Sequence, residues 1–213
     1  MKSKWILLGL MACLCAIPAF SQNLELTGDY SYLHFTPTLG NLNTINFNGG
    51  GFDASFLFHG RFGIKADLQF YANNSFTATF PTTVTRFGTI PAGTYRGNGS
   101  FQTYLFGPIV KAHMKHFEPF GEVLFGVAHT GVFTSFANSV RAAPGATLTF
   151  TGGQTPFALA AGGGLDIPLG HIFAIRAGEV DYVLTRFQNP ITGNNNQNSF
   201  RILGGIQVRL GAR

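Results

Sequence analysis

The sequence predicts an all-β protein, a closed antiparallel up-and-down β-barrel of eight strands that crosses a membrane. Three observations predict this fold. The 213 residues include 23 Phe and 28 Gly while only 11% are charged, a composition that disfavours helices and a soluble surface. Apolar and polar residues alternate with a period of two along most of the chain, as in half-buried strands. Short and long connections between these segments alternate along the chain, which is typical of membrane barrels.

Residues 1–21 have the pattern of a secretory signal peptide. Lys2 and Lys4 form a positive start, residues 5–17 are apolar, and Pro18 is followed by an Ala-Phe-Ser cleavage site. We expect this segment to be removed on export, which leaves residues 22–213 as the barrel domain. A competing interpretation is a lipoprotein cleavage box in the Leu-Met-Ala-Cys stretch at residues 10–13.

Both cysteines, Cys13 and Cys15, belong to the predicted signal. The exported chain would therefore contain no disulfide, thiolate metal site or cysteine nucleophile. After residue 21 no stretch approaches the roughly 20 apolar residues of a membrane-spanning helix. A chain of this kind can cross a membrane only as strands, and in lipid those strands must close into a barrel to pair every backbone group.

The alternation predicts the strands in order. The clearest is residues 62–70, in which Phe62 and Ile64 point one way and Lys65 and Asp67 the other. Near Gly178 the phase of the seventh strand slips, which predicts a β-bulge. The eight predicted strands are residues 24–35, 50–58, 62–70, 101–111, 120–130, 155–167, 172–187 and 200–210.

The connections fall into two classes by length. The short ones are residues 59–61, 112–116 and 168–171, and the long ones are residues 37–49, 72–100, 131–154 and 188–198. Strict alternation places all the long loops at one end of the barrel and both termini at the other. The loop at 72–100 leaves two alternatives open. It extends its neighbouring strands beyond the membrane as a hairpin, or it adds a membrane hairpin and makes ten strands.

The polar face of the strands identifies which side of the barrel is outside. A soluble lipocalin-type barrel also alternates, but with its apolar face inward. Here the polar face carries small residues and isolated charges of both signs, which suit the narrow, filled interior of an eight-stranded barrel. We interpret the charges as a structural salt-bridge network, with a narrow ion path as the alternative. The predicted network comprises Glu25, Asp29, Asp53, Lys65, Asp67, Glu122, Asp166, Arg176, Arg201 and Arg209.

Aromatic residues gather near the strand ends and predict two interfacial belts, one at each membrane surface. The belt on the long-loop side would comprise Tyr30, Tyr32, Phe70, Tyr71, Phe101, Phe187 and Phe200. The belt on the short-turn side would comprise Phe58, Phe62, Phe117, Phe120 and Phe173.

Four stretches carry a resemblance to a known family. They are residues 104–108 (Tyr-Leu-Phe-Gly-Pro), 119–126 (Pro-Phe-Gly-Glu-Val-Leu-Phe-Gly), 162–166 (Gly-Gly-Gly-Leu-Asp), and Arg176 with Asp-Tyr at 181–182. The chain resembles the bacterial outer-membrane β-barrels, specifically the eight-stranded group that includes the OmpA transmembrane domain and the opacity-type surface proteins. The resemblance implies insertion into outer-membrane lipid by the barrel assembly machinery, and no enzymatic activity. The chain departs from the family by ending in Leu-Gly-Ala-Arg rather than on an aromatic residue.

The histidines are the remaining candidates for chemistry. His113 and His116 have a metal-like spacing, but they lie in a predicted basic turn rather than on a helix. His34 and His129, near the long-loop end, would serve a lipid-A-modifying enzyme. A Ser/His hydrolase also needs an orienting carboxylate, and residues 126–155 contain no acidic residue. We expect no catalytic, metal-binding or cofactor-binding residue.

The sequence therefore predicts a monomeric outer-membrane barrel with an envelope-structural or surface-interaction role. The formal net charge of +5 is dispersed and gives no reason to expect a nucleic-acid partner. Three alternatives stay open at this point: a lipid-A-modifying barrel enzyme, a small-solute pore, and a soluble lipocalin-like periplasmic binder.

Overall fold

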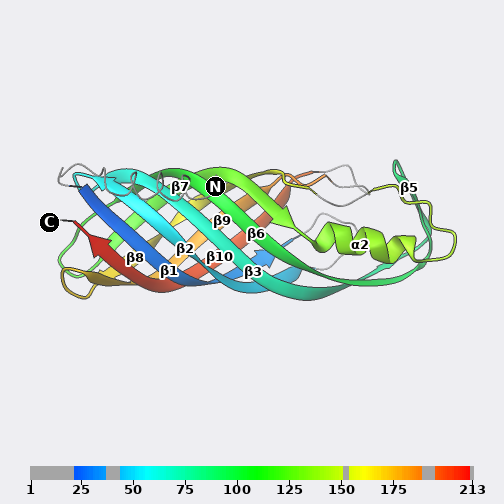
Figure 1. The fold of residues 1–213 in the computed structure, drawn as a ribbon, viewed down its shortest axis with the longest axis horizontal. Coiled ribbons are helices and arrows are strands. Elements are labelled where there is room, and N and C mark those ends of the chain that lie inside the picture. The colour runs from blue at the N-terminus through cyan, green and yellow to red at the C-terminus, as the bar shows by residue number, and fades with distance from the viewer. Residues whose placement is uncertain (1–21, 37–43, 151–153, 189–194, 212–213) are drawn as a thin grey trace, which may run out of the picture.

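The computed structural model describes residues 22–36, 44–150, 154–188 and 195–211. The predicted signal peptide lies outside these residues. Eight long strands form one closed antiparallel barrel in the order β1-β10-β9-β8-β7-β6-β3-β2, which confirms the predicted fold class and strand number (Figure 1). They are β1 (Gln22–Phe35), β2 (Ile45–Phe58), β3 (Phe62–Phe80), β6 (Gly93–Lys111), β7 (Glu118–Thr130), β8 (Phe157–Pro168), β9 (Phe173–Thr185) and β10 (Gln197–Leu210).

The barrel closes by pairing its first strand with its last. β1 and β10 run antiparallel with Leu24 opposite Leu210, so the chain enters and leaves the barrel at the same end. The β2–β3 connection is the predicted tight hairpin. In this three-residue connection the Arg61 N–H donates to the Phe58 carbonyl oxygen at 3.2 Å. The two central residues of that turn, His59 and Gly60, have positive φ angles of 49° and 71°, as hairpin turns that match the strand twist require.

The two faces of the strands have opposite chemistry. On β3, Lys65 and Asp67 are fully buried, whereas Phe62 is 65% and Ile64 40% exposed. The outer wall consists of the outward-facing positions of the barrel strands, with β3 counted to residue 72 and β6 from residue 101. The described part of this wall contains no Asp, Glu, Lys or Arg. The charged face therefore points inward.

The predicted irregularity in β9 is confirmed. Leu165 of β8 pairs with Gly178, but the next residue, Asp166, pairs with Arg176, so Ala177 is skipped. This one-residue β-bulge shifts the alternation. It allows both Arg176 and Asp181 to point into the barrel.

At the long-loop end, residues 72–100 adopt the first of their two predicted alternatives, an extension of the neighbouring strands as a hairpin. β3 and β6 continue past the barrel as a paired hairpin up to Phe80 and Gly93, so most of the predicted 72–100 loop is strand and none of it adds to the barrel wall. The two short strands β4 (Thr83–Thr85) and β5 (Gly88–Ile90) cap this hairpin. Within the predicted 37–49 loop, residues 45–49 belong to β2.

The predicted loop at 131–154 contains a helix, α2 (Val132–Arg141). Its buried residues Val132, Phe133, Phe136, Ala137 and Val140 follow the spacing of an amphipathic helix. In Figure 1, α2 lies along the hairpin beyond the barrel. No helix among the described residues is long and apolar enough to span a membrane.

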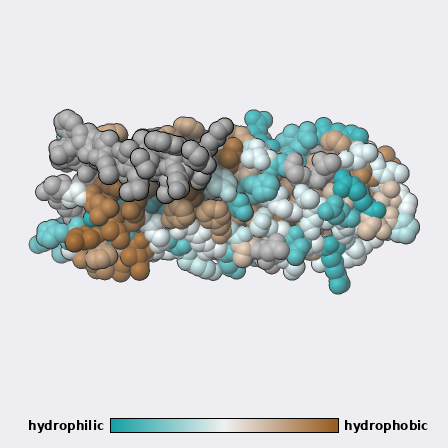
Figure 2. Space-filling model, viewed as in Figure 1, coloured by the Kyte–Doolittle hydropathy of each residue, from teal (hydrophilic) through white to brown (hydrophobic). Residues whose placement is uncertain are grey.

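Four residues assigned to the aromatic belts are instead inside the barrel. Tyr71, Phe101 and Phe187 are at most 3% exposed, and Phe120 is 7% exposed. The remaining belt residues face outward or are half-buried: Tyr30, Tyr32, Phe70 and Phe200 at one end, and Phe58, Phe62, Phe117 and Phe173 at the other. Figure 2 shows apolar surface over the barrel and more hydrophilic surface over the hairpin end.

The inward-facing aromatics at the long-loop end form an apolar plug, which consists of Phe35, Phe47, Phe101, Phe133 and Phe187. All five are completely buried. Phe35 lies 5.1 Å from Phe101, and Phe133 of α2 lies 5.2 Å from Phe187, measured between ring centroids. The helix therefore closes the mouth of the barrel, because its Phe133 packs on Phe187, which in turn contacts Phe35 and Phe101 of the barrel strands.

Candidate functional site

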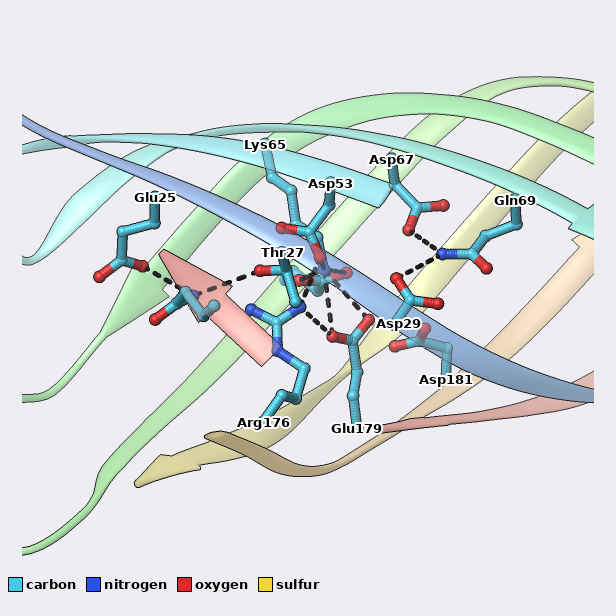
Figure 3. Close-up of polar contacts among 12 residues, drawn as sticks. Glu25, Thr27, Asp29, Asp53, Lys65, Asp67, Gln69, Arg176, Glu179 and Asp181 are labelled. Atoms are coloured by element: carbon cyan, nitrogen blue, oxygen red, sulfur yellow. Dashed lines mark hydrogen bonds and ion pairs between the residues drawn. The ribbon is translucent and has the colours of Figure 1, made fainter. Parts of the chain in front are cut away.

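The interior of the barrel holds a continuous set of charged side chains, which we call the lumen cluster. All ten residues predicted for the network lie in it. The structure adds Lys111, Glu118, Glu179 and Asp181. Because the side chains of a strand alternate between faces, every second residue of each strand projects into the lumen. Figure 3 shows how these side chains converge from several strands.

Lys65 lies at the centre of the lumen cluster. Its Nζ donates hydrogen bonds to Glu122 Oε2 at 2.9 Å and to Glu179 Oε1 at 3.1 Å, and lies 3.4 Å from Asp53 Oδ2. β3 and β9 lie on opposite sides of the closed strand order. The Lys65–Glu179 pair therefore spans the full width of the lumen.

Arg176 joins the centre of the cluster to its short-turn side. Its Nη1 contacts Asp53 at 2.5 Å and Glu179 at 2.8 Å, while its Nε donates to Asp166 at 3.0 Å. The guanidinium carbon lies 4.6 Å from the centre of the Phe120 ring. Buried cations gain from such a ring face. This gives Phe120 an electrostatic role inside the barrel.

Arg201 occupies the long-loop side of the cluster. It donates to Asp67 at 2.7 Å and to Asp181 at 2.8 Å. Gln69 donates to Asp29 at 3.0 Å beside it. The polar contacts then give way to the apolar plug, so charged and aromatic layers follow one another along the lumen.

The short-turn side of the cluster is equally well paired. Lys111 donates to Glu25 and, at 2.7 Å, to Asp166. Arg209 forms a two-pronged pair with Glu118, with its Nη2 2.6 Å from Oε2 and its Nη1 3.1 Å from Oε1. These pairs again join strands that are not neighbours, so each ties the barrel together across the lumen.

All the acidic residues of the chain lie in the lumen of the barrel. The chain contains nine Asp and Glu residues, and every one belongs to the lumen cluster, together with five basic side chains: Lys65, Lys111, Arg176, Arg201 and Arg209. The lumen thus contains more acidic than basic groups, while the remaining surface carries basic groups alone. Burial of so many charges is tolerated only with close pairing, which the distances above provide.

Glu122, Glu179 and Asp181 place one oxygen each within 4.8 Å of one another, as metal ligands would. The Lys65 ammonium lies between two of these carboxylates and donates to both. The carboxylates therefore have a cation from the chain itself, and we assign no metal to them.

The histidines lie outside the lumen. His34 Nδ1 is 2.8 Å from Asn46 Oδ1, and His129 Nδ1 is 3.2 Å from the Gln154 carbonyl oxygen. Because all the carboxylates are inside the barrel, neither histidine has the acidic partner that a Ser/His site requires. His113 and His116 are exposed in the short turn, with His113 Nε2 3.9 Å from Glu118 Oε2.

No protein-family model and no curated protein sequence matches this chain. Solved structures do match its fold. Neisserial surface protein A is similar with a TM-score of 0.54 and 11% identity, over 87% of this chain and 96% of the other. The outer membrane protein OprG from Pseudomonas aeruginosa is similar with a TM-score of 0.55 and 10% identity, over 90% and 97%. The chain therefore has the fold of the eight-stranded outer-membrane barrels, as the resemblance predicted.

Proposed function

We propose that the protein resides in the bacterial outer membrane as a monomeric eight-stranded barrel with a structural or surface-interaction role. One observation carries the proposal: charged residues fill the lumen while the described outer wall has none. A soluble binder would need the reverse arrangement, with charges outside and an apolar cavity inside. Insertion by the barrel assembly machinery after removal of residues 1–21 belongs to this proposal.

The outer wall supports a lipid environment. Phe52, Phe106 and Phe125 are about half-exposed near the middle of their strands, and aromatic side chains surround both ends. Soluble monomers rarely expose a continuous apolar surface of this extent. A hydrocarbon layer would cover it without leaving any charge in lipid.

The filled lumen argues against a solute pore. Lys65, Asp53 and Glu179 are completely buried in the middle of the barrel, and the apolar plug closes the long-loop end. An eight-stranded barrel is just wide enough for side chains to fill. The placement of His34 and His129 without carboxylate partners argues against the enzyme alternative.

The hairpin and α2 form an ordered element with apolar packing of its own beyond the barrel, and this supports a surface role. Phe136 of α2 packs 5.5 Å from Phe80 of the hairpin, between ring centroids. Arg141 donates to the carbonyl oxygens of Leu148 and Phe150, which fixes the chain after the helix. A projecting element with its own core is a suitable surface for contacts outside the cell.

Surface labelling of intact cells tests the proposal. Val84→Cys lies at the tip of the hairpin, where Val84 is 81% exposed, and Leu169→Cys lies in a short turn, where Leu169 is 57% exposed. A membrane-impermeant maleimide should label the Val84→Cys protein in intact cells and the Leu169→Cys protein only after lysis, with the wild type as background control. Equal labelling of both variants in the periplasmic fraction would refute the proposed location.

A further inference from the structure

An apolar groove runs along the outer wall between the short turns and the middle of the barrel. Two cavities of about 420 and 300 Å³ share Phe62, Val110 and Gly121 among their lining residues, so they form one continuous depression. These three residues are paired neighbours across β3, β6 and β7. The depression exists because Phe62 has a large side chain, Val110 has a medium one and Gly121 has none, and these three positions follow one another around the wall.

The local backbone deepens this groove. Pairing between β6 and β7 is interrupted at Gly107 and Pro108, since proline has no N–H to donate to the ladder. The next outward position around the wall, Gly163 opposite Gly121, also lacks a side chain. Val123 borders the far end of the groove, toward the middle of the barrel.

The end of the groove at the short turns is basic. Arg61 and His113 line it, and the exposed Lys115 follows in the same turn. Glu122 lines the inner part of the groove, but its carboxylate accepts hydrogen bonds from Lys65 in the lumen. Glu118, which lies 3.9 Å from His113, is buried and paired with Arg209. An anionic group at this rim would meet basic side chains and no exposed acid.

We propose that this groove binds one anionic glycerophospholipid of the membrane leaflet on the short-turn side. One acyl chain lies over Gly121 between Phe62 and Val123, and the phosphate contacts Arg61, whose guanidinium suits bidentate phosphate binding. The inference rests on the proposed membrane location. The lining is apolar along the strands and basic at the turn, which matches the two parts of such a lipid.

Two glycines of the outer wall offer a matched pair of variants. A Cβ on Gly121 would meet only the Gly162 carbonyl oxygen at 3.7 Å, and a Cβ on Gly28 would meet nothing within 4 Å. Gly121→Leu should therefore fill the groove without straining the backbone. Gly28→Leu adds the same side chain to the wall on β1, away from the groove.

Native mass spectrometry of the folded protein in detergent, with added phosphatidylglycerol, tests the inference. We expect one bound lipid at an affinity about tenfold above that of a diacylglycerol with the same chains. Gly121→Leu should abolish binding, Arg61→Ala should lower it to the diacylglycerol level, and Gly28→Leu should leave it unchanged. Equal binding by the Gly121→Leu and wild-type proteins, or equal binding of the two lipids, would overturn it.

Failure of the lipid site can be distinguished from failure of the proposed function. A protein that is found in the outer membrane and folds as a barrel, yet binds no phosphatidylglycerol, overturns the lipid site alone. A protein that is soluble in the periplasm overturns both, since its outer wall would then meet no lipid.

Discussion

Lys65 on β3 and Glu179 on β9 meet across the full width of the barrel, with Nζ 3.1 Å from Oε1. Both side chains are completely buried. This contact ties diametrically opposite strands together across the lumen, in addition to the hydrogen bonds between neighbouring strands.

Lys65→Met should be strongly destabilising. The change keeps much of the side-chain volume but removes the cation paired with Glu122, while Glu179 and Asp53 keep only Arg176 and its neighbours. Removing one partner of a buried pair costs about 3–5 kcal/mol. The free energy of unfolding would be measured by urea titration in detergent micelles. The folded fraction at each urea concentration would be read from electrophoretic migration without boiling. A loss below about 1 kcal/mol would show that the cluster does not hold the strands together.

Asp29→Asn should be almost neutral, in contrast to Lys65→Met. The lumen holds more carboxyl groups than basic groups, and Asp29 accepts its side-chain hydrogen bond from the neutral Gln69 rather than from a cation. Removing its charge should change the free energy of unfolding by less than about 1 kcal/mol. The same unfolding assay applies, and a loss as large as that of Lys65→Met would contradict the charge balance described above.

Phe133→Ala should loosen the long-loop end without dissolving the barrel. Phe133 is fully buried against Phe187, and truncation of a buried Phe costs about 3–5 kcal/mol. We expect faster protease cleavage between residues 131 and 154, while the barrel keeps its compact migration. Val84→Ala, at an exposed position, is the control. Unchanged cleavage of the Phe133→Ala protein would mean that α2 does not depend on the apolar plug.

His34→Ala and His129→Ala should leave lipid A unaltered. Neither histidine has an acidic partner on the outside of the barrel, so we expect the same lipid A mass spectrum from cells expressing wild-type or variant protein. A modification present with the wild type and lost with either variant would establish an enzyme and overturn the proposed role.

The strand pattern could be predicted from the sequence because a two-residue period survives along each strand. The ten predicted lumen residues all lie inside for this reason. Glu179 was missed because it follows the bulge, where the alternation changes phase. Glu118 and Lys111 were missed because they lie at strand ends beside a turn, where a charge is equally expected on the surface.

The aromatic residues show a second limit of prediction from the sequence. Tyr71 and Phe101 were assigned to a belt from their position near strand ends, but Tyr71 shares the inward parity of Lys65, Asp67 and Gln69. Parity, rather than position along the strand, decides the face. The helix α2 was hidden by the loop-like composition around it, although its apolar residues at 132, 133, 136, 137 and 140 carry a helical spacing.

The most direct test of the central claim is the migration of the protein from the outer-membrane fraction in detergent gels, with and without boiling. Closed barrels whose strands are all paired resist detergent unfolding, so we predict a compact, fast-migrating band that shifts to the position of the unfolded chain on boiling. The result that would contradict the account is a protein recovered from the soluble periplasmic fraction, with identical migration before and after boiling.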